Sequence, residues 1–454
     1  MVADLRIKFG RSAVEPGVKE ARVITNTPYR EYFTVQKLSF TTSKEDEVIK
    51  PLFYYHNVKG FLEAVAQQRE RVVEDCTLKV GGDTGKVFTQ LLVSMYVEDP
   101  DPIENKLIKQ RSKEDGICGG QKFVETGQRM ILLLAWCKGV QQNRENLENI
   151  FDHVCIQKHR FKLTGDYHFA MSCFALMDWS SLHPCLYCRR SRVKGVWEEA
   201  PGGDDMLHTF GDIELRTLVR RERGSVYCSA ETALAKSCIG MVLVWGEGDE
   251  SNTIVLDKMP PPTVYNLLGL NTVLRPYLEN VWDGNLNADL KSELGLVPPS
   301  YHGKDEDLEG HQYAKFLDNQ EKFKDRLLAK DNTAMFYRFF LAFKNMKDGI
   351  FSSVLASGWK EICKKFRESL TLLNSYCGVP IIPKLHIMSV HVEEWVTEHR
   401  TALGDSSEQA FEADHAMFAK LWSGFVVGDE DSAVFLDNGL KAGLIFNSNN
   451  TSAK

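Results

Sequence analysis

Hydrophobic and polar residues alternate along the stretch that follows residue 76, and this alternation predicts β-strands. Leu78 and Val80 alternate with polar neighbours, two glycines interrupt the run after Val80, and the run resumes over residues 87–97. We therefore expect a hairpin with Asp83 at its bend. The elements expected next are a buried strand over residues 130–136, a helix over 146–154, and a short strand over 160–163 that ends at Gly165 and Asp166.

The regions on either side of this stretch have different patterns. Residues 1–75 mix extended pieces with one helix, expected over 58–73, and residues 196–380 have a largely helical pattern. The clearest helical segments in that second region are 267–278, 319–328 and 333–343. Near the end, residues 407–422 form another expected helix, on which four residues recur along one face: Phe411, His415, Phe418 and Trp422.

The order of these elements predicts an α/β protein. A hairpin, a third strand, a helix and a fourth strand follow the order of an RNase H-like half, with a mixed sheet. We expect five parts: an amino-terminal region (1–75), the first part of the core (76–195), a mostly helical insertion (196–380), a return to the core with its terminal helix (381–430), and a carboxy-terminal tail (431–454). Residues 447–454 have the composition of a frayed end.

Composition narrows the class of protein. With 454 residues and 43% apolar side chains, the chain can bury a large core. Its net charge of −7 does not mark it as a nucleic-acid binder. Two local basic stretches could still contact phosphates or form solvated faces: Arg189, Arg190, Arg192 and Lys194, and Arg216, Arg220, Arg221 and Arg223.

The cysteines and the apolar stretches indicate an intracellular protein without a membrane span. The eleven cysteines are scattered and odd in number, and the first residues lack the apolar segment of a secretory leader, so we expect reduced thiols inside the cell. The longest apolar stretch, residues 130–137, is too short to cross a bilayer. We therefore expect no membrane span.

Two cysteines and two histidines have the spacing of a metal site. Cys185 and Cys188 form a C-x2-C turn, and His386 and His391 form an H-x4-H pair. We expect a structural zinc ion that clamps the insertion at its base, with His183 as a spare ligand. Two histidines five residues apart do not share a face of a regular helix, so they should flank a bend or an irregular turn. The alternative is a chance C-x2-C beside ordinary histidines.

Three carboxylates are candidates for a second metal site. Asp83 and Asp166 follow expected strands, and Glu412 lies on the expected terminal helix. Phosphodiester cleavage by two metal ions requires carboxylates that converge from separate parts of a chain, and Mg²⁺ prefers such oxygen ligands. A single Asp at a strand end is more commonly a turn former. Glu408 competes with Glu412, because residues four apart share a helix face.

Five of these features occur in the order found in one family. The chain resembles the DDE transposases of the Transib, Chapaev and CACTA kind, to which the V(D)J recombinase catalytic subunit is related. In that pattern a first Asp follows the opening strand, as Asp83 does, and a second precedes a C-x2-C; Asp166 stands nineteen residues before Cys185. An H-x4-H then follows a helical insertion. The final Glu lies on a helix that also carries His415 and Phe418 here, which favours Glu412.

The resemblance covers residues 76 to 425 and implies a function. Asp83, Asp166 and Glu412 would hold two Mg²⁺ or Mn²⁺ ions for DNA hydrolysis and strand transfer, and zinc would be structural. The implied partners are double-stranded DNA, as transposon ends and target, and a second copy in a homodimer, and the implied location is the nucleus. One alternative is a transposase-derived DNA- or protein-binding protein without catalysis, and another is a truncated element product. We expect the family's usual end-reading domain to be absent or reduced, because residues 1–75 show no basic helix-turn-helix or zinc-finger pattern.

Overall fold

The computed structural model describes the chain in segments. These are residues 30–42, 46–68, 73, 77–84, 88–96, 129–140, 144–154, 161–165, 167–174, 184–193, 196–197, 207–209, 255–262, 273–297, 300–301, 304–305, 310–352, 354–406, 409–425, 429–430 and 432–451. They fall into two compact units. Unit 1 takes the described residues of Met1–Ala175 and Gln409–Lys454, and unit 2 takes those of Leu176–Ile239 and Ser251–Glu408.

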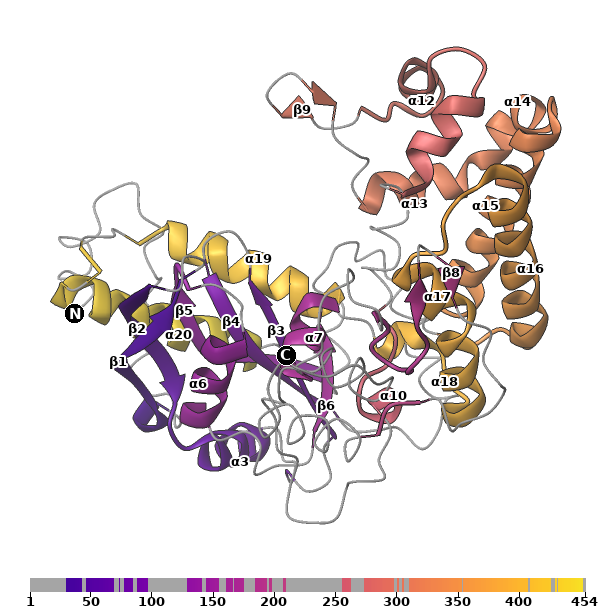
Figure 1. The fold of residues 1–454 in the computed structure, drawn as a ribbon. Coiled ribbons are helices and arrows are strands. Elements are labelled where there is room, and N and C mark those ends of the chain that lie inside the picture. The colour runs from indigo at the N-terminus through magenta and orange to yellow at the C-terminus, as the bar shows by residue number, and fades with distance from the viewer. Residues whose placement is uncertain are drawn as a thin grey trace, which may run out of the picture. The chain divides into compact units, whose positions relative to one another are not determined.

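Unit 1 is built on a mixed six-stranded sheet, so the expected α/β class is confirmed (Figure 1). The strand order is β1-β2-β5-β4-β3-β6. Neighbours pair antiparallel except β3 and β6, which are parallel. The strands are β1 (Phe33–Thr41), β2 (Glu47–Tyr55), β3 (Thr77–Thr84), β4 (Phe88–Tyr96), β5 (Arg129–Lys138) and β6 (Lys162–Gly165).

The local predictions for this unit are mostly confirmed. The buried strand over 130–136 is part of β5, and the helix over 146–154 is α6 (Arg144–Val154). The helix expected over 58–73 is α3 (Val58–Gln68), and residues 69–72 lie outside the described segments. One detail is wrong: Asp83 lies inside β3, paired with Gln90, and not at the bend. The amino-terminal strands also belong to the same sheet, because β2 pairs with β5.

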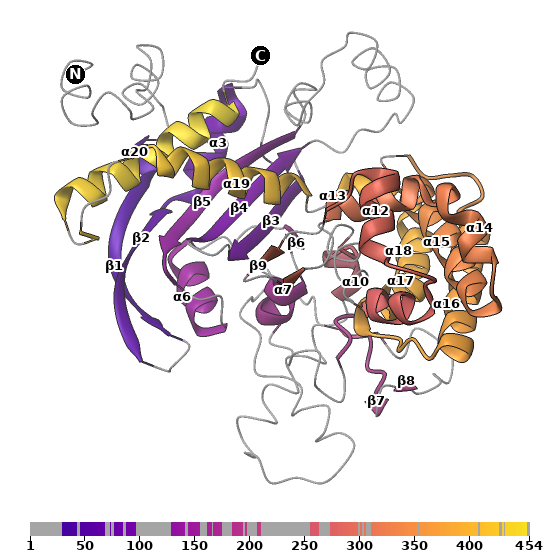
Figure 2. The same cartoon turned by 90° about the horizontal axis from the view of Figure 1, so that it is seen from above.

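Helices cover both faces of the sheet. Phe53 and Tyr54 are neighbours on β2, so their side chains point to opposite faces. Phe53 contacts Phe435 of α20 (Ala433–Thr451), whereas Tyr54 meets the ring of His153 on α6. The same face carries α19 (Gln409–Ser423) as well as α20 (Figure 2). Phe418 of α19 packs against Trp136, which stacks on Phe53.

The carboxy-terminal segment is folded, which corrects the prediction of a tail over 431–454 with a frayed end. Helix α20 extends to Thr451, and Asn447 within it is completely buried. The Asn447 side chain accepts a hydrogen bond from the Leu133 N–H at 2.7 Å and donates to the Leu133 carbonyl oxygen at 2.9 Å. Its Nδ2 also donates to the Tyr55 hydroxyl oxygen at 3.0 Å. Buried polar side chains persist in a fold when they are paired in this way.

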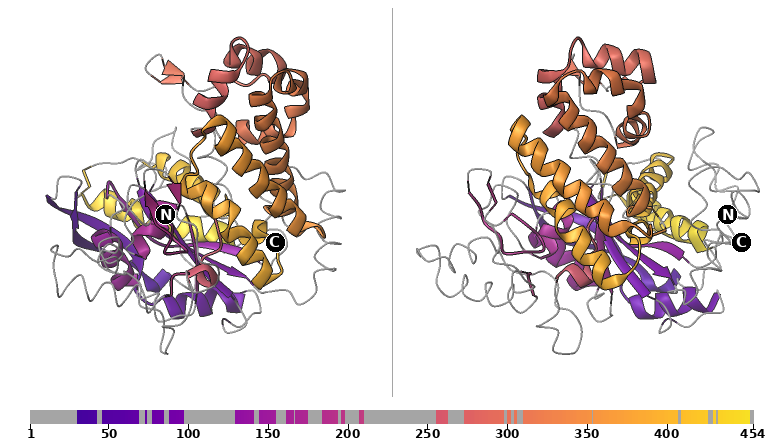
Figure 3. Two further views of the ribbon diagram at one scale, coloured as in Figure 1. Left: turned by 45° about the vertical axis from the view of Figure 1, so that its right-hand side comes forward. Right: turned by 90° about the vertical axis from the view of Figure 1, so that its right-hand side faces the viewer.

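Unit 2 is mostly helical. Its longest described helices, α15 (Asp331–Gly349) and α16 (Trp359–Cys377), lie side by side (Figure 3). The rings of Phe339 and Phe366 are in contact between them. The remaining helices are α10 (Val255–Lys258), a helix over 273–281, α12 (Leu286–Leu294), α13 (Gly310–Asp318), η5 (Gln320–Phe323), α14 (Lys324–Leu328), α17 (Pro383–Ser389), α18 (His391–His399) and η6 (Leu403–Ser406). The described part of unit 2 also has two small hairpins: β7 (Arg192–Val193) with β8 (Val196–Trp197), and β9 (Ser300–Tyr301) with β10 (Lys304–Asp305). Among the described residues, no helix is both long and apolar enough to cross a membrane.

Candidate metal centres

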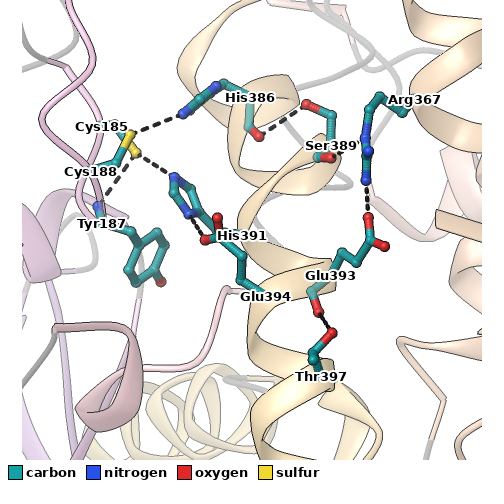
Figure 4. A network of polar contacts seen from close by, with 10 residues as sticks. All are labelled: Cys185, Tyr187, Cys188, Arg367, His386, Ser389, His391, Glu393, Glu394 and Thr397. Carbon is teal, nitrogen blue, oxygen red and sulfur yellow. Dashed lines mark hydrogen bonds and ion pairs between the residues drawn. The ribbon is translucent and has the colours of Figure 1, made fainter. Parts of the chain in front are cut away.

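Four buried side chains of unit 2 bring their ligand atoms together. The sulfur atoms of Cys185 and Cys188 and one ring nitrogen each of His386 and His391 all lie within 4.8 Å of one another. Cys185 Sγ is 3.3 Å from His391 Nε2, and Cys188 Sγ is 3.3 Å from His386 Nε2 (Figure 4). None of the four residues is more than 3% exposed. The predicted pairing of C-x2-C with H-x4-H is therefore present as one cluster that could bind zinc.

A break between two helices makes this convergence possible. His386 lies in α17 and His391 begins α18, and Val390 between them has φ −118° and ψ −64°. In one continuous helix, residues five apart would point about 140° away from each other. The expectation that the two histidines flank an irregular turn is confirmed. The cysteines lie in the loop before β7, where the Tyr187 N–H donates to Cys185 Sγ at 3.4 Å.

A second layer of contacts orients the two histidines. Glu394 Oε2 lies 2.6 Å from His391 Nδ1, which leaves Nε2 of that ring directed at the sulfur atoms. The indole of Trp197 stacks on the His386 ring with centroids 3.9 Å apart, and its Nε1 donates to the Ile381 carbonyl oxygen at 2.6 Å. Such outer contacts fix ring orientation and raise ligand basicity in metal sites.

The charges in the cluster already favour one thiolate. Burial opposes ionisation of Cys188, but the hydrogen bond with Cys185 and the charge of His391 hold the pKa of Cys188 well below its usual range. Burial, together with the neighbouring Cys188, raises the pKa of Cys185. Although burial alone would lower it, the charge of Cys188 and the contact with Glu394 raise the pKa of His391 to about 9. Burial lowers the pKa of His386.

The donor set has the composition of a closed zinc site. Two thiolates and two imidazoles supply four protein ligands, which is the complement of a structural tetrahedral site and leaves no position for a substrate. Cys188 and His386 are 198 positions apart in sequence, so an ion here would join two distant segments of unit 2. The spare candidate, His183, lies outside the described residues.

The three candidate carboxylates belong to unit 1, and their neighbours lie close together. Asp83 is on β3, and Gly82 beside it pairs with Gly165, the residue directly before Asp166. Thr164 pairs with Gly81 in the same parallel ladder. The side chain of Asp83 and the whole of Asp166 lie outside the described part of the chain.

Helix α19, which carries Glu412, packs on the same strand. A Cβ atom on Gly81 would lie 2.6 Å from the ring of Phe411, so this ring packs directly on the strand, two residues from Asp83. Glu412 follows Phe411 on α19; its own side chain is not among the described ones, nor is Glu408. The described residues next to the three acids, Gly82, Gly165 and Phe411, therefore lie close together at the β3–β6 edge of the sheet.

The structure describes only part of the two basic stretches. Arg189, Arg190 and Arg192 follow the cysteine turn and are half-buried, whereas Lys194 and residues 216–223 are outside the described residues.

Sequence reasoning missed Glu394 and Trp197 as companions of the histidines. Glu394 had a readable signal, because it stands three residues after His391 and so shares its helix face.

Comparison with known proteins does not identify a relative. A scan with protein-family models finds no match for this chain, and a search of curated proteins finds no significant match.

Proposed function

We propose that this chain is a transposase-like DNA recombinase of the DDE kind, which cleaves and joins phosphodiester bonds with two divalent metal ions. The observation that carries the proposal is the convergence of three acid-bearing segments in unit 1. Gly82 and Gly165 pair across β3 and β6, and Phe411 of α19 packs on Gly81. The acids next to these residues, Asp83, Asp166 and Glu412, are the catalytic candidates.

The strand order supports an RNase H-like core. Strands β3, β4 and β5 form a consecutive antiparallel meander, and β6 returns after α6 to pair in parallel with β3. This is the order of a hairpin, third strand, helix and fourth strand that the sequence predicts for an RNase H-like half. Among the described residues, the first part of unit 1 ends at Phe174 and the second begins at Gln409, where α19 begins.

The residues present fit a pair of Mg²⁺ or Mn²⁺ ions. Oxygen ligands from separate chain segments suit these ions, which when bound would activate an attacking water or 3′-hydroxyl and stabilise the leaving oxygen. The role of the chain itself is to hold its acids in place. Gly81 and Gly82 let aromatic rings approach β3 from both faces, since Cβ atoms there would lie 2.6 Å from Phe411 and 2.2 Å from Phe169.

Zinc has a structural role in this proposal. The Cys2His2 cluster would be a tetrahedral zinc site that ties the C-x2-C loop to α17 and α18 within unit 2. Because the two segments are about 200 residues apart, the binding energy of the ion would offset the entropy of docking them.

Double-stranded DNA, as transposon ends and target, is the proposed partner. With a net charge of −7, the chain needs local positive charge to attract phosphates. The bound divalent ions and the basic stretch of Arg189 and Arg190 would supply it. A homodimer that brings two DNA ends together and a nuclear location follow from the family resemblance and are part of the proposal.

Nicking of supercoiled plasmid DNA tests the proposed catalysis. We expect nicking that requires Mn²⁺ or Mg²⁺. The substitutions Asp83→Asn and Asp166→Asn should each lower the nicking rate by at least about 100-fold, because each removes a metal ligand. Asp437→Asn is the matched control, since Asp437 is an exposed acid on α20 that pairs only with Lys441 among the described residues. Undiminished nicking by the Asp83→Asn protein would exclude this site.

The same assay separates the proposal from its alternatives. Tight DNA binding without nicking, in folded protein loaded with Mn²⁺, would instead support a transposase-derived binding protein that has lost catalysis. If the protein neither binds nor nicks DNA, the remaining alternatives are a truncated element product and a transposase-derived protein-binding protein.

Metal analysis of the purified protein tests the zinc site. We expect about one zinc ion per chain in the wild type and in Cys377→Ser, and far less in Cys188→Ser. Cys377 is a suitable control because it is a free cysteine of unit 2 outside the cluster. Zinc content near zero in wild-type protein that stays folded in chelator would contradict the assignment.

A further inference from the structure

Gln90 is a buried amide on β4 with no hydrogen-bond partner among the described residues. It is 2% exposed, and both its Nε2 and its Oε1 are shielded from solvent and unpaired. Buried amides in native proteins are nearly always hydrogen-bonded, and each exception needs an explanation. An unpaired buried amide lowers the stability of the fold without ligand. Such a residue is therefore a candidate for a hydrogen bond that forms only when a ligand is bound.

The position of Gln90 in the sheet connects it with the proposed catalytic site. Gln90 is directly opposite Asp83 in the ladder between β3 and β4, and directly opposite Trp136 in the ladder between β4 and β5. Residues directly opposite each other share a sheet face, with Cβ atoms about 4.5–5.5 Å apart. Positions 83, 90 and 136 thus form one row across three strands.

The other side of Gln90 is apolar except for one group. The ring of Trp136 is enclosed by Phe53, Phe88 and Phe418, and its Nε1 is also buried and unpaired. The strand neighbours on the same face as Gln90, Phe88 and Leu92, are buried and apolar. An apolar residue at position 90 would fit this core better than an unpaired amide.

We propose that Gln90 is a positioning residue for the metal-binding carboxylate of Asp83, an inference that rests on the proposed function. In the metal-loaded protein, Gln90 Nε2 would donate a hydrogen bond to the carboxylate of Asp83, and Gln90 Oε1 would accept one from Trp136 Nε1. Asp83 would then be held in the orientation that its metal ion requires. Partners of this kind commonly govern metal affinity without touching the ion.

Measurement of Mn²⁺ affinity and of folding stability on the full chain tests this role. Met is close to Gln in length and lacks its hydrogen-bonding groups, so Gln90→Met should weaken Mn²⁺ binding by about 10-fold, as loss of an outer-shell partner does. The midpoint of urea unfolding without Mn²⁺ should stay the same or rise, because a buried unpaired amide is removed. Mn²⁺ affinity within about two-fold of the wild type would overturn the proposal.

Two controls make the outcome specific. Ser94 is on the same strand, and its buried hydroxyl is also unpaired, but it is opposite Lys79 and not an acid. Ser94→Ala should therefore leave Mn²⁺ affinity unchanged, and a loss equal to that of Gln90→Met would overturn the assignment to position 90. Asp83→Asn separates the two proposals: if it abolishes Mn²⁺ binding and Gln90→Met does not change it, only the role of Gln90 fails. A wild-type protein that binds no Mn²⁺ contradicts the proposed function itself.

Discussion

Asn447 shows how a single side chain can continue a sheet. On β5 the last residue paired with β2 is Ala135, opposite Tyr54, and β2 ends at Tyr55. Beyond that point the Asn447 amide provides both an acceptor and a donor to the backbone of Leu133. One buried side chain thereby satisfies two backbone groups and ties α20 to the sheet.

Removal of this amide should destabilise unit 1 strongly. Asn447→Leu would leave the N–H and the carbonyl of Leu133 buried without their present partners, at a cost of about 2–4 kcal/mol in the free energy of unfolding. Urea denaturation followed by circular dichroism measures this change. Val434→Ala is the control on the same helix, because Val434 is 53% exposed. An Asn447→Leu protein as stable as this control would show that the two hydrogen bonds contribute nothing.

The charge states of the cysteines and histidines predict how zinc binding depends on pH. The lowered pKa of Cys188 favours its thiolate and the lowered pKa of His386 favours its neutral form, whereas the raised pKa of Cys185 and the pKa of about 9 of His391 favour their protonated forms. Binding of zinc at pH 7 should therefore release about two protons and strengthen as pH rises toward 9. Calorimetry in buffers of different ionisation enthalpy counts these protons. Release of none, or affinity that falls between pH 6 and 8, would contradict these charge states.

Single residues also show what sequence reasoning can reach. The break between α17 and α18 was predictable, since the spacing of His386 and His391 does not fit one face of a regular helix. The fate of Asn447 was not, because a run of Asn, Ser and Thr has the composition of a frayed end. Its burial depends on Leu133 and Tyr55, which are more than 300 residues away in the chain.

At the scale of elements, β3 is the strand on which the candidate site depends. The two glycines in it were expected to interrupt the strand and to leave Asp83 at a bend. Instead the strand runs on to Thr84, and its glycines face aromatic rings: Phe411 of α19 beside Gly81, and Phe169 of α7 (Tyr167–Cys173) beside Gly82. Without side chains, these two positions let a helix approach the strand on either face.

A side chain at Gly82 should disturb this packing. In Gly82→Ala the new methyl group would lie 2.2 Å from the Phe169 ring, so the ring or the strand must move, at a cost of about 1–3 kcal/mol in stability. Val434→Ala is again the control, because Val434 lies in the same unit and is 53% exposed. Thermal unfolding compares the two variants directly. Equal midpoints would mean that α7 does not pack on β3 as described.

At the scale of the whole molecule, local sequence patterns predicted individual helices and strands but did not predict which distant strands pair. Periodicity located β5, α6 and α19, because a helix or strand that buries one face displays that face in its own sequence. The joining of β1 and β2 to the sheet depends on the pairing of β2 with β5, about 80 residues later in the chain, and neither segment encodes it alone. The Cys2His2 cluster was an exception, since its ligand chemistry is visible in the residue types themselves.

We propose that Asp83, Asp166 and Glu412 hold divalent metal ions in unit 1, and the rest of the proposed function depends on this site. Crystals of the wild-type protein soaked in Mn²⁺ and measured above the manganese absorption edge test it most directly. Anomalous density should appear at the β3–β6 edge, with carboxylate oxygens of Asp83 and Asp166 about 2.0–2.3 Å from manganese and Glu412 in the same site. Absence of manganese there, with the three carboxylates separated by more than about 10 Å, would contradict the claim.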